Sequence, residues 1–272
     1  MKKYLILFLL LVIILCSLKK KYETYQNYNK NNINLVFSIN VYRNHNNWIH
    51  KQLNNIEQYV KIPYIVILNS SDDLYKELIE DNILKNDSKI FINNVHSNKQ
   101  RHTGSILRGI IMNMRWILSN FTFDYFIILS QRTFFYNIFD EKIITKLKNG
   151  NYPEHNNKWF RDDFKNTKLY KFLESNNNVD LKISSSPHEG ILLTQKMVIF
   201  IDNFLKQHRD IEKDIYNYKN VVEEFAIQTL LKTYNFNYNL ISIPTVFSTP
   251  IEDLYIQKNK DYLIYKVNYP KK

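Results

Sequence analysis

Between residues 35 and 129, short apolar runs of strand length alternate with longer segments in which apolar residues recur at the helical period. The runs predict strands at 35–41, 64–68, 89–92 and 123–129, and the segments between them predict helices at about 46–60, 73–81 and 104–119. Strands that are apolar throughout are buried on both faces, which is typical of a parallel sheet with helices on each side. The sequence therefore predicts an α/β fold of the Rossmann type.

Ligands of such folds bind beyond the carboxyl ends of the strands, near the point where the strand order reverses. The residues that directly follow the predicted strands are therefore the first candidates for a site. They are Tyr42–Asn44, Asn69–Asp73 and Ser130–Arg132.

The first 33 residues have a different character. Tyr4–Leu18 is uncharged and lies between lysines on both sides. A helix rises about 1.5 Å per residue, so a helix of this run is shorter than the hydrocarbon core of a bilayer, which is about 30 Å thick. It can span the bilayer only if the bilayer thins locally or if the flanking lysine side chains extend to the interface. No small-x-small site follows the run, which favours an uncleaved signal anchor over a cleaved signal peptide. We expect an anchor at 1–21, a polar stem at 22–33 and one domain at 34–272.

The 272 residues carry a formal charge of +11 and a single Cys. Five lysines flank the apolar run, and the spacing of the others does not build a basic face with aromatic residues, so we expect no nucleic acid partner. A basic pocket for a diphosphate or another anion needs only a few residues. One Cys excludes a disulfide framework and Cys-rich metal sites.

Several classes of α/β enzyme lack their motif in this chain. The four glycines form neither G-x-G-x-x-G nor G-x-x-x-x-G-K-[ST], which argues against dinucleotide enzymes and P-loop NTPases. A G-x-S-x-G elbow is also missing from the sequence, which argues against an α/β serine hydrolase. The seven His form no H-x-x-x-H motif. A nucleotide-sugar transferase is the remaining candidate.

Six segments carry a shared order of motifs, namely 104–107 (GSIL), 123–130 (FDYFIILS), 149–154 (NGNYPE), 188–194 (HEGILLT), 223–231 (EEFAIQTLL) and 265–267 (YKV). In this order they resemble the core-2/I-branching N-acetylglucosaminyltransferase and peptide O-xylosyltransferase family of glycosyltransferases. The resemblance spans roughly residues 35 to 268. It implies a GT-A-like domain that transfers a sugar of the GlcNAc or xylose type, with inversion, from a UDP-sugar to a hydroxyl of a glycan or glycoprotein. For the anchored chain we expect a single-pass type II membrane protein with the domain in the lumen of the Golgi or ER.

Many GT-A enzymes hold a divalent ion with a D-x-D pair after the central strand. Here Ser130-Gln131-Arg132 stands in that place, so we expect no metal and no other cofactor. The family likewise works without a metal and uses basic residues near the C-terminus. Arg132 and Lys266 are therefore expected to meet the charge of the leaving diphosphate, although Lys266 also fits an exposed basic tail. Asn69 and Ser70 stand where the family has an aspartate and are expected to contact the donor.

Transfer to a hydroxyl also needs a base. Glu224 matches the family's base position and is expected at the start of a helix, whereas Glu223 is expected to serve the helix N-terminus electrostatically. An alternative is that both are simply first-turn acids. Glu154, Trp159 and Arg161 form the expected acceptor site, because they lie in an aromatic and polar loop.

Two other functions stay open at this point. The segment 130–136 departs from the family's LSGSDYPL, which suits a catalytically degenerate, membrane-anchored adaptor. The positive charge suits a module that binds an anionic ligand without catalysis.

Overall fold

The computed structural model describes residues 34–42, 48–100, 103–148, 162–176, 181, 183–184, 188–236, 241–242, 245–249 and 264–267. All of them belong to one unit, residues 33–272. The expected anchor at 1–21 and stem at 22–33 lie outside the described residues. Within the ranges given above, no helix combines the length and the apolar character needed to cross a bilayer.

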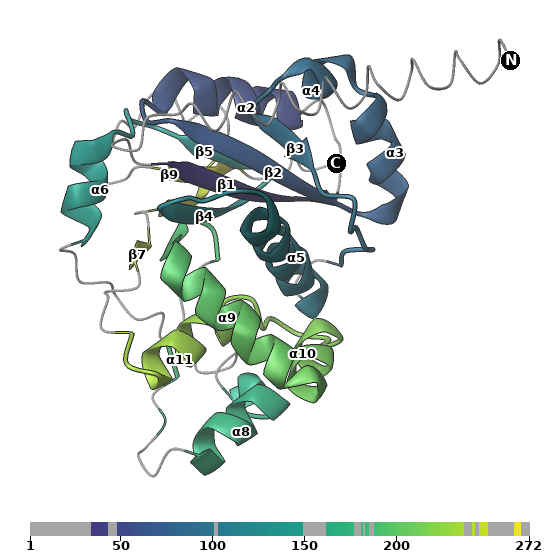
Figure 1. Cartoon of the computed structure of the whole chain (residues 1–272), viewed down its shortest axis with the longest axis vertical. Coiled ribbons are helices and arrows are strands. Elements are labelled where there is room, and N and C mark those ends of the chain that lie inside the picture. The colour runs from purple at the N-terminus through teal and green to yellow at the C-terminus, as the bar shows by residue number, and fades with distance from the viewer. Residues whose placement is uncertain are drawn as a thin grey trace, which may run out of the picture. The chain divides into compact units, whose positions relative to one another are not determined.

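A six-stranded mixed sheet with the order β3-β2-β1-β4-β6-β7 forms the centre of the fold (Figure 1). Its strands are β1 (Leu35–Val41), β2 (Tyr64–Ser70), β3 (Ile90–Ile92), β4 (Tyr125–Ser130), β6 (Ile191–Thr194) and β7 (Ile241–Ser242). The first four strands run parallel, whereas β6 runs antiparallel to β4 and β7 antiparallel to β6. The α/β prediction is confirmed, and the four strands read from apolar runs all exist.

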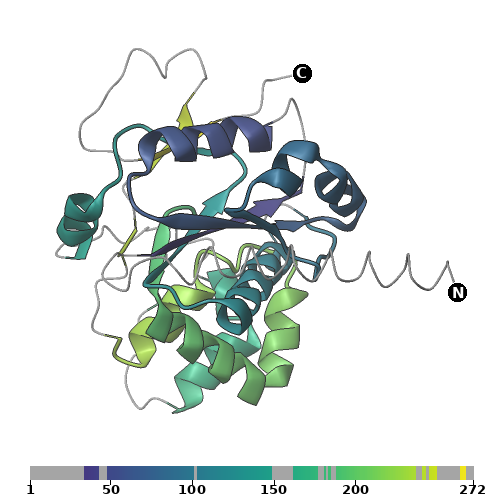
Figure 2. The same cartoon turned by 45° about the horizontal axis from the view of Figure 1, so that its top comes forward.

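Helices cover both faces of the sheet (Figures 1 and 2). On one side lies α2 (Trp48–Tyr59), and on the other lies α5 (Gly104–Asn120) with α9 (Gln195–Gln207) and α10 (Arg209–Tyr216) beyond it. The remaining helices are α3 (Asp72–Glu80), α4 (Asn82–Asn86), α6 (Glu141–Lys148), α8 (Lys168–Asn176) and α11 (Ala226–Thr233). The arrangement is a three-layer sandwich, as expected for a largely parallel sheet.

The two faces of β1 differ in chemistry. Leu35, Phe37, Ile39 and Val41 belong to the apolar core that also contains residues of α2. The alternate residues include Ser38 and Asn40, which are buried toward α5.

Asn113 of α5 makes the polar contacts of this second face. Its Nδ2 donates to Ser38 Oγ at 3.0 Å and to Ile67 O at 3.2 Å, and its Oδ1 accepts from Asn93 Nδ2 at 3.0 Å. Both polar atoms of the Asn113 side chain therefore have partners, which fixes α5 over β1 and β2.

A smaller sheet with the order β5-β9-β8 stands beside α2. Its strands are β5 (Thr133–Phe135), β9 (Ile264–Val267) and β8 (Thr245–Thr249). Asn55 of α2 holds β5 in the manner of a neighbouring strand, because its Oδ1 accepts from Phe135 N at 2.6 Å and its Nδ2 donates to Phe135 O at 3.1 Å. The antiparallel pairing of β5 with β9 places Thr133 opposite Lys266.

Glycine at the start of α5 permits a close approach to α10. The N–H of Gly104 donates to Tyr218 O at 2.8 Å. A Cβ atom at this position would overlap the carbonyl oxygen of Ile215 and lie 2.9 Å from the carbonyl carbons of Ile215 and Tyr216. Only a residue without a side chain fits here.

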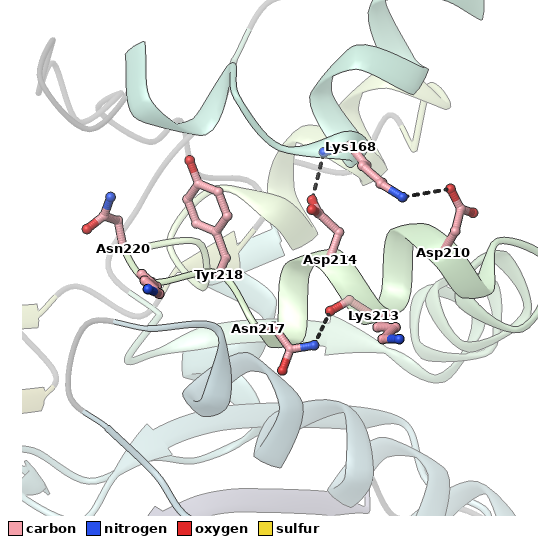
Figure 3. Close-up of a pocket in the computed structure, with 8 residues that line it drawn as sticks. Lys168, Asp210, Lys213, Asp214, Asn217, Tyr218 and Asn220 are labelled. Atoms are coloured by element: carbon pink, nitrogen blue, oxygen red, sulfur yellow. Dashed lines mark hydrogen bonds and ion pairs between the residues drawn. The ribbon is translucent and has the colours of Figure 1, made fainter.

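The first residue of α8 contacts two acidic residues of α10 (Figure 3). The backbone N–H of Lys168 donates to Asp214 Oδ2 at 2.7 Å, and its Nζ lies 3.7 Å from Asp210 Oδ2. These contacts fix the start of α8 against α10.

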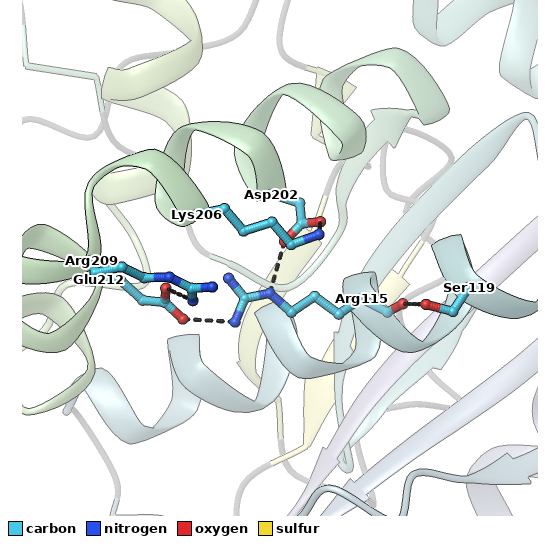
Figure 4. A network of polar contacts seen from close by, with 6 residues as sticks. All are labelled: Arg115, Ser119, Asp202, Lys206, Arg209 and Glu212. Carbon is cyan, nitrogen blue, oxygen red and sulfur yellow. Dashed lines mark hydrogen bonds and ion pairs between the residues drawn. The ribbon is translucent and has the colours of Figure 1, made fainter.

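Arg115 ties α5 to both α9 and α10 (Figure 4). Its Nε lies 2.7 Å from Asp202 Oδ1, and its Nη1 lies 2.7 Å from Glu212 Oε1. Each carboxylate has a second cation, because Lys206 Nζ lies 2.6 Å from Asp202 and Arg209 Nη1 lies 2.8 Å from Glu212. Both carboxylates are buried, so the network is a structural element of this helical layer.

We expect Arg115→Met to lower the free energy of unfolding by about 2 kcal/mol, measured by urea denaturation. Removing one partner of a buried pair usually costs about 3–5 kcal/mol, but here Lys206 and Arg209 continue to compensate the two carboxylates. A triple variant that also carries Asp202→Leu and Glu212→Leu should recover most of the lost stability, because the two buried carboxylates that Arg115 compensates are then removed as well. A stability equal to wild type for Arg115→Met alone would contradict the expectation.

Candidate functional site

The strand order reverses between β1 and β4. From β1 the chain moves through α2 to β2 on one side, and it later crosses back through α5 to β4 on the other side. Sheets of this kind bind ligands in the crevice outside the carboxyl ends of the two strands. Tyr42 follows β1 and Gln131 follows β4, and they meet there, because Tyr42 N donates to Gln131 Oε1 at 3.0 Å.

The turn after β4 consists of buried polar residues. Gln52 of α2 donates from Nε2 to both Ser130 O and Thr133 O at 2.7 Å. Thr133 Oγ1 accepts from Ser130 N at 3.2 Å, which closes the bend from inside. Side chains therefore build the bend here, although the sequence lacks the glycine and proline of the motif it resembles. Arg132 lies in this bend at the carboxyl edge of the sheet and is buried, with 4% of its surface exposed.

The main chain of Lys266 lies close to this turn. Lys266 pairs with Thr133, which is the direct neighbour of Arg132. The two positions expected to meet the charge of a diphosphate are thus adjacent in the β5-β9 pair, although they are far apart in the sequence.

Glu189 is buried at the same edge. Gly190 adopts a φ of 86° and its N–H donates to Ile128 O at 2.7 Å, so the turn before β6 lies against the end of β4. This places Glu189, which is 1% exposed, beside the carboxyl end of that strand. His188 accompanies it, with Nε2 3.4 Å from Glu189 Oε1.

Glu223 and Glu224 lie in a turn directly before α11. The helix begins at Ala226, so Glu224 precedes its start by two residues, and the alternative that both are first-turn acids is wrong. Phe225 N and Ala226 N both bond to Val222 O, which shapes the turn. Glu224 is half-buried, whereas Glu223 is fully buried and its Oε2 accepts from Val222 N at 3.0 Å.

Burial, together with the charges of Glu224 and Glu189, raises the pKa of Glu223 to about 8 against the lowering effect of backbone hydrogen bonds. The three carboxyl groups therefore share one region of the carboxyl edge. At neutral pH the Glu223 carboxyl is protonated, so it supplies no charge to the helix N-terminus, contrary to the expectation from the sequence. The site thus contains one neutral carboxyl group at this pH.

The raised pKa of Glu223 predicts a pH-dependent stability. Between its ordinary pKa of 4.5 and about 8, the folded chain holds a proton that the unfolded chain releases, so the free energy of unfolding falls as pH rises through this window. Glu223→Gln mimics the protonated form and should remove this decrease. Urea denaturation of both proteins from pH 5 to pH 8.5 tests it, and the stability of the variant relative to wild type should grow steadily with pH. A constant difference would show that Glu223 titrates normally.

Asn69 and Ser70 end β2 and are fully buried. Asn69 Nδ2 donates to Val95 O at 2.8 Å, and its Oδ1 accepts from Lys99 Nζ at 2.6 Å. Lys99 Nζ also donates to Ser70 O at 2.6 Å and to Ser97 O at 3.1 Å. The two residues expected to contact the donor thus hold the ammonium group of Lys99 instead.

Sequence reasoning missed Lys99. Burial lowers the pKa of Lys99 to about 7, against the opposing effect of the Asp72 carboxylate. The sequence offers one signal that Lys99 could belong to the site, which is its position in the loop after β3, at the carboxyl edge of the sheet. Its ammonium carries positive charge into the site below about pH 7.

Glu154, Trp159 and Arg161, the expected acceptor residues, lie outside the described residues. Among those that the structure does describe, no three His, Cys, Asp or Glu are grouped to hold a metal ion. Asp72 pairs with His96, because Asp72 Oδ1 lies 2.6 Å from His96 Nδ1.

The expected residues that the structure describes thus converge on one edge of the sheet, where the main chain of Lys266 also lies. A scan against protein-family models finds no match to the chain. A search of curated proteins finds no match either. What the molecule does must therefore be inferred from its own residues.

Proposed function

We propose that this chain is an inverting, metal-independent glycosyltransferase with a GT-A-like domain. It moves a sugar of the GlcNAc or xylose type from a UDP-sugar to a hydroxyl of a glycan or glycoprotein acceptor. Residues 1–21 anchor it in a membrane of the Golgi or ER, with the domain in the lumen. The observation that supports the proposal is that a buried arginine follows β4 at the switch point of the sheet, while Glu189, Glu223 and Glu224 share one region near the same edge.

The cationic side of this site suits a departing diphosphate. Arg132 is permanently charged, and its guanidinium is suited to phosphate oxygens. It occupies the place after β4 where a D-x-D pair would hold a metal. The strand that contains Lys266 runs alongside it. A guanidinium in this position would stabilise the negative charge that develops on the leaving UDP.

The acidic side suits proton removal from an acceptor hydroxyl. A general base must be ionised at the working pH and must reach the acceptor oxygen. Glu223 is protonated near neutral pH and enclosed, so it is a poor base there. Glu224 is its neighbour and is half-buried, which leaves part of it accessible to an acceptor. Glu224 is therefore the base of the proposed reaction, in which the acceptor oxygen attacks the anomeric carbon opposite to UDP.

One observation favours the alternative of a catalytically degenerate adaptor. Asn69 and Ser70 are fully buried, and the side chain of Asn69 already bonds to Val95 and Lys99. If the protein's own side chains occupy the place of the donor in this way, the chain would keep the transferase fold but would not catalyse sugar transfer.

The two functions separate in one assay. The full chain, purified in mild detergent, is incubated with a panel of UDP-sugars, and the release of UDP is measured with and without glycan acceptors and in the presence of EDTA. The transferase proposal expects EDTA-resistant release of UDP with at least one donor. Failure to bind or cleave any UDP-sugar would overturn it and favour the adaptor.

A further inference from the structure

A cavity of about 730 Å³ lies between α8, α10 and the segment Asn217–Asn220 that follows α10 (Figure 3). Cavities that hold small ligands usually measure about 300–1,000 Å³, so the size is sufficient. Most ligand pockets are lined largely by apolar side chains, whereas every side chain that lines this one ends in a polar group. The cavity therefore suits a ligand rich in hydrogen-bonding groups.

The charges of the lining are unequally compensated. Both acidic residues have partners, since Asp210 pairs with the ammonium of Lys168 and Asp214 accepts from its backbone N–H. Lys213 and Lys219 also line the cavity, and neither has a carboxylate within 4.0 Å in the part of the chain that the structure describes. The lining thus holds three ammonium groups against two carboxylates, and Lys213 and Lys219 carry its excess positive charge.

Tyr218 presents the aromatic ring of the cavity in a fixed position. Its hydroxyl donates to Asp163 O at 2.6 Å and lies 3.1 Å from Asp163 Oδ1, while its carbonyl accepts from Gly104 N. The ring is therefore held at both ends before a ligand arrives, which lowers the entropy lost on binding. An anchored aromatic face suits the apolar face of a sugar ring.

Asn217 and Asn220 add amide groups on the same segment. Asn217 Nδ2 donates to Lys213 O at 2.8 Å, which orients this amide. Amides offer both donors and acceptors, the combination that hydroxyl groups need. Figure 3 shows Asn220 and Tyr218 on one side and Lys168 with Asp214 on the other.

We propose that this cavity binds an anionic saccharide, with Tyr218 against a sugar ring and Lys213 and Lys219 against its carboxylate or sulfate groups. The inference rests on the proposed function and extends it, because it names the acceptor class. Only Val221 and Val222, both buried, separate Asn220 from Glu223 in the chain. A saccharide held here would therefore be bound on the segment that leads into the catalytic turn.

Binding is tested on the full chain in mild detergent, without any donor, so that a failed transferase assay leaves this test intact. Calorimetry compares a hyaluronan hexasaccharide, which carries carboxylates, with neutral chitohexaose at about 150 mM salt, where surface charges are screened beyond about 8 Å. We expect the anionic saccharide to bind at least tenfold more tightly. Lys213→Gln combined with Lys219→Gln should weaken it at least tenfold, because charge-assisted contacts are lost.

A matched variant controls for net charge. Lys142→Gln combined with Lys146→Gln removes the same charge from the exposed face of α6 and should leave binding unchanged. The proposal is overturned if the wild-type chain binds neither saccharide, if it binds both equally, or if the two double variants weaken binding to the same extent.

Discussion

Gly104→Ala is expected to lower the free energy of unfolding by about 3 kcal/mol or more. The added methyl group would overlap the backbone carbonyl of Ile215, and a backbone atom cannot turn aside as a side chain can. Helix α5 would have to move away from α10, and the hydrogen bond from Gly104 N to Tyr218 O would be lost. Since domains are stable by only about 5–15 kcal/mol, this change alone removes a large share of the stability.

Urea denaturation measures this loss, and a second glycine of the same helix provides the comparison. At Gly109 a Cβ atom would overlap Asn40 Oδ1 and lie 2.8 Å from Lys99 Cε, both of which are side-chain atoms and so yield at a lower cost than a backbone carbonyl does. Gly109→Ala should therefore cost clearly less, because alanine is also favoured over glycine in a helix by about 1 kcal/mol. Equal stability of Gly104→Ala and wild type would mean that α5 and α10 are further apart than described.

Glu224→Gln is expected to reduce sugar transfer by about 100-fold or more while leaving the affinity for UDP nearly unchanged. The amide keeps the shape of the side chain but does not accept the proton of the acceptor hydroxyl. UDP is held on the cationic side of the site in the proposed mechanism, so its binding does not depend on this carboxylate. Turnover is measured by release of UDP, and affinity by titration with UDP alone.

Glu223→Gln is the matched control for this experiment. Because the carboxyl of Glu223 is already protonated at neutral pH, its amide should leave turnover at pH 7 close to wild type. If Glu223→Gln abolishes turnover and Glu224→Gln does not, then Glu223 is the base. If neither change matters, the transferase proposal itself falls in favour of the adaptor.

The parallel part of the sheet was predictable because its signal is local. All seven residues of β1 are buried and five of them are apolar, so the strand stands out in the sequence as an almost continuous apolar run. The small sheet had no comparable signal. Strand β5 has three residues, and it is defined by bonds to Asn55 and to β9, which lie far away in the sequence. Pairing at a distance leaves no periodic pattern to read.

The site was predictable in place but not in detail. The rule that ligands bind at the carboxyl ends of strands led to Asn69 and Arg132, which do lie at that edge. Lys99 was missed because its burial results from a loop that folds back over β2. The positions of Glu223 and Glu224 were misjudged because they depend on where α11 begins, and helix boundaries are hard to read when no capping residue marks them.

The pairing of β5 with β9 has a consequence for the synthesis of the chain. Proteins emerge from the ribosome amino end first, and regions with distant partners wait for those partners. Residues 133–135 leave the ribosome long before residues 264–267, so one edge of β5 stays without its strand partner while the rest of the domain is translated. We therefore expect the turn around Arg132 to mature last, and nascent chains that stop before residue 264 to bind chaperones through this edge.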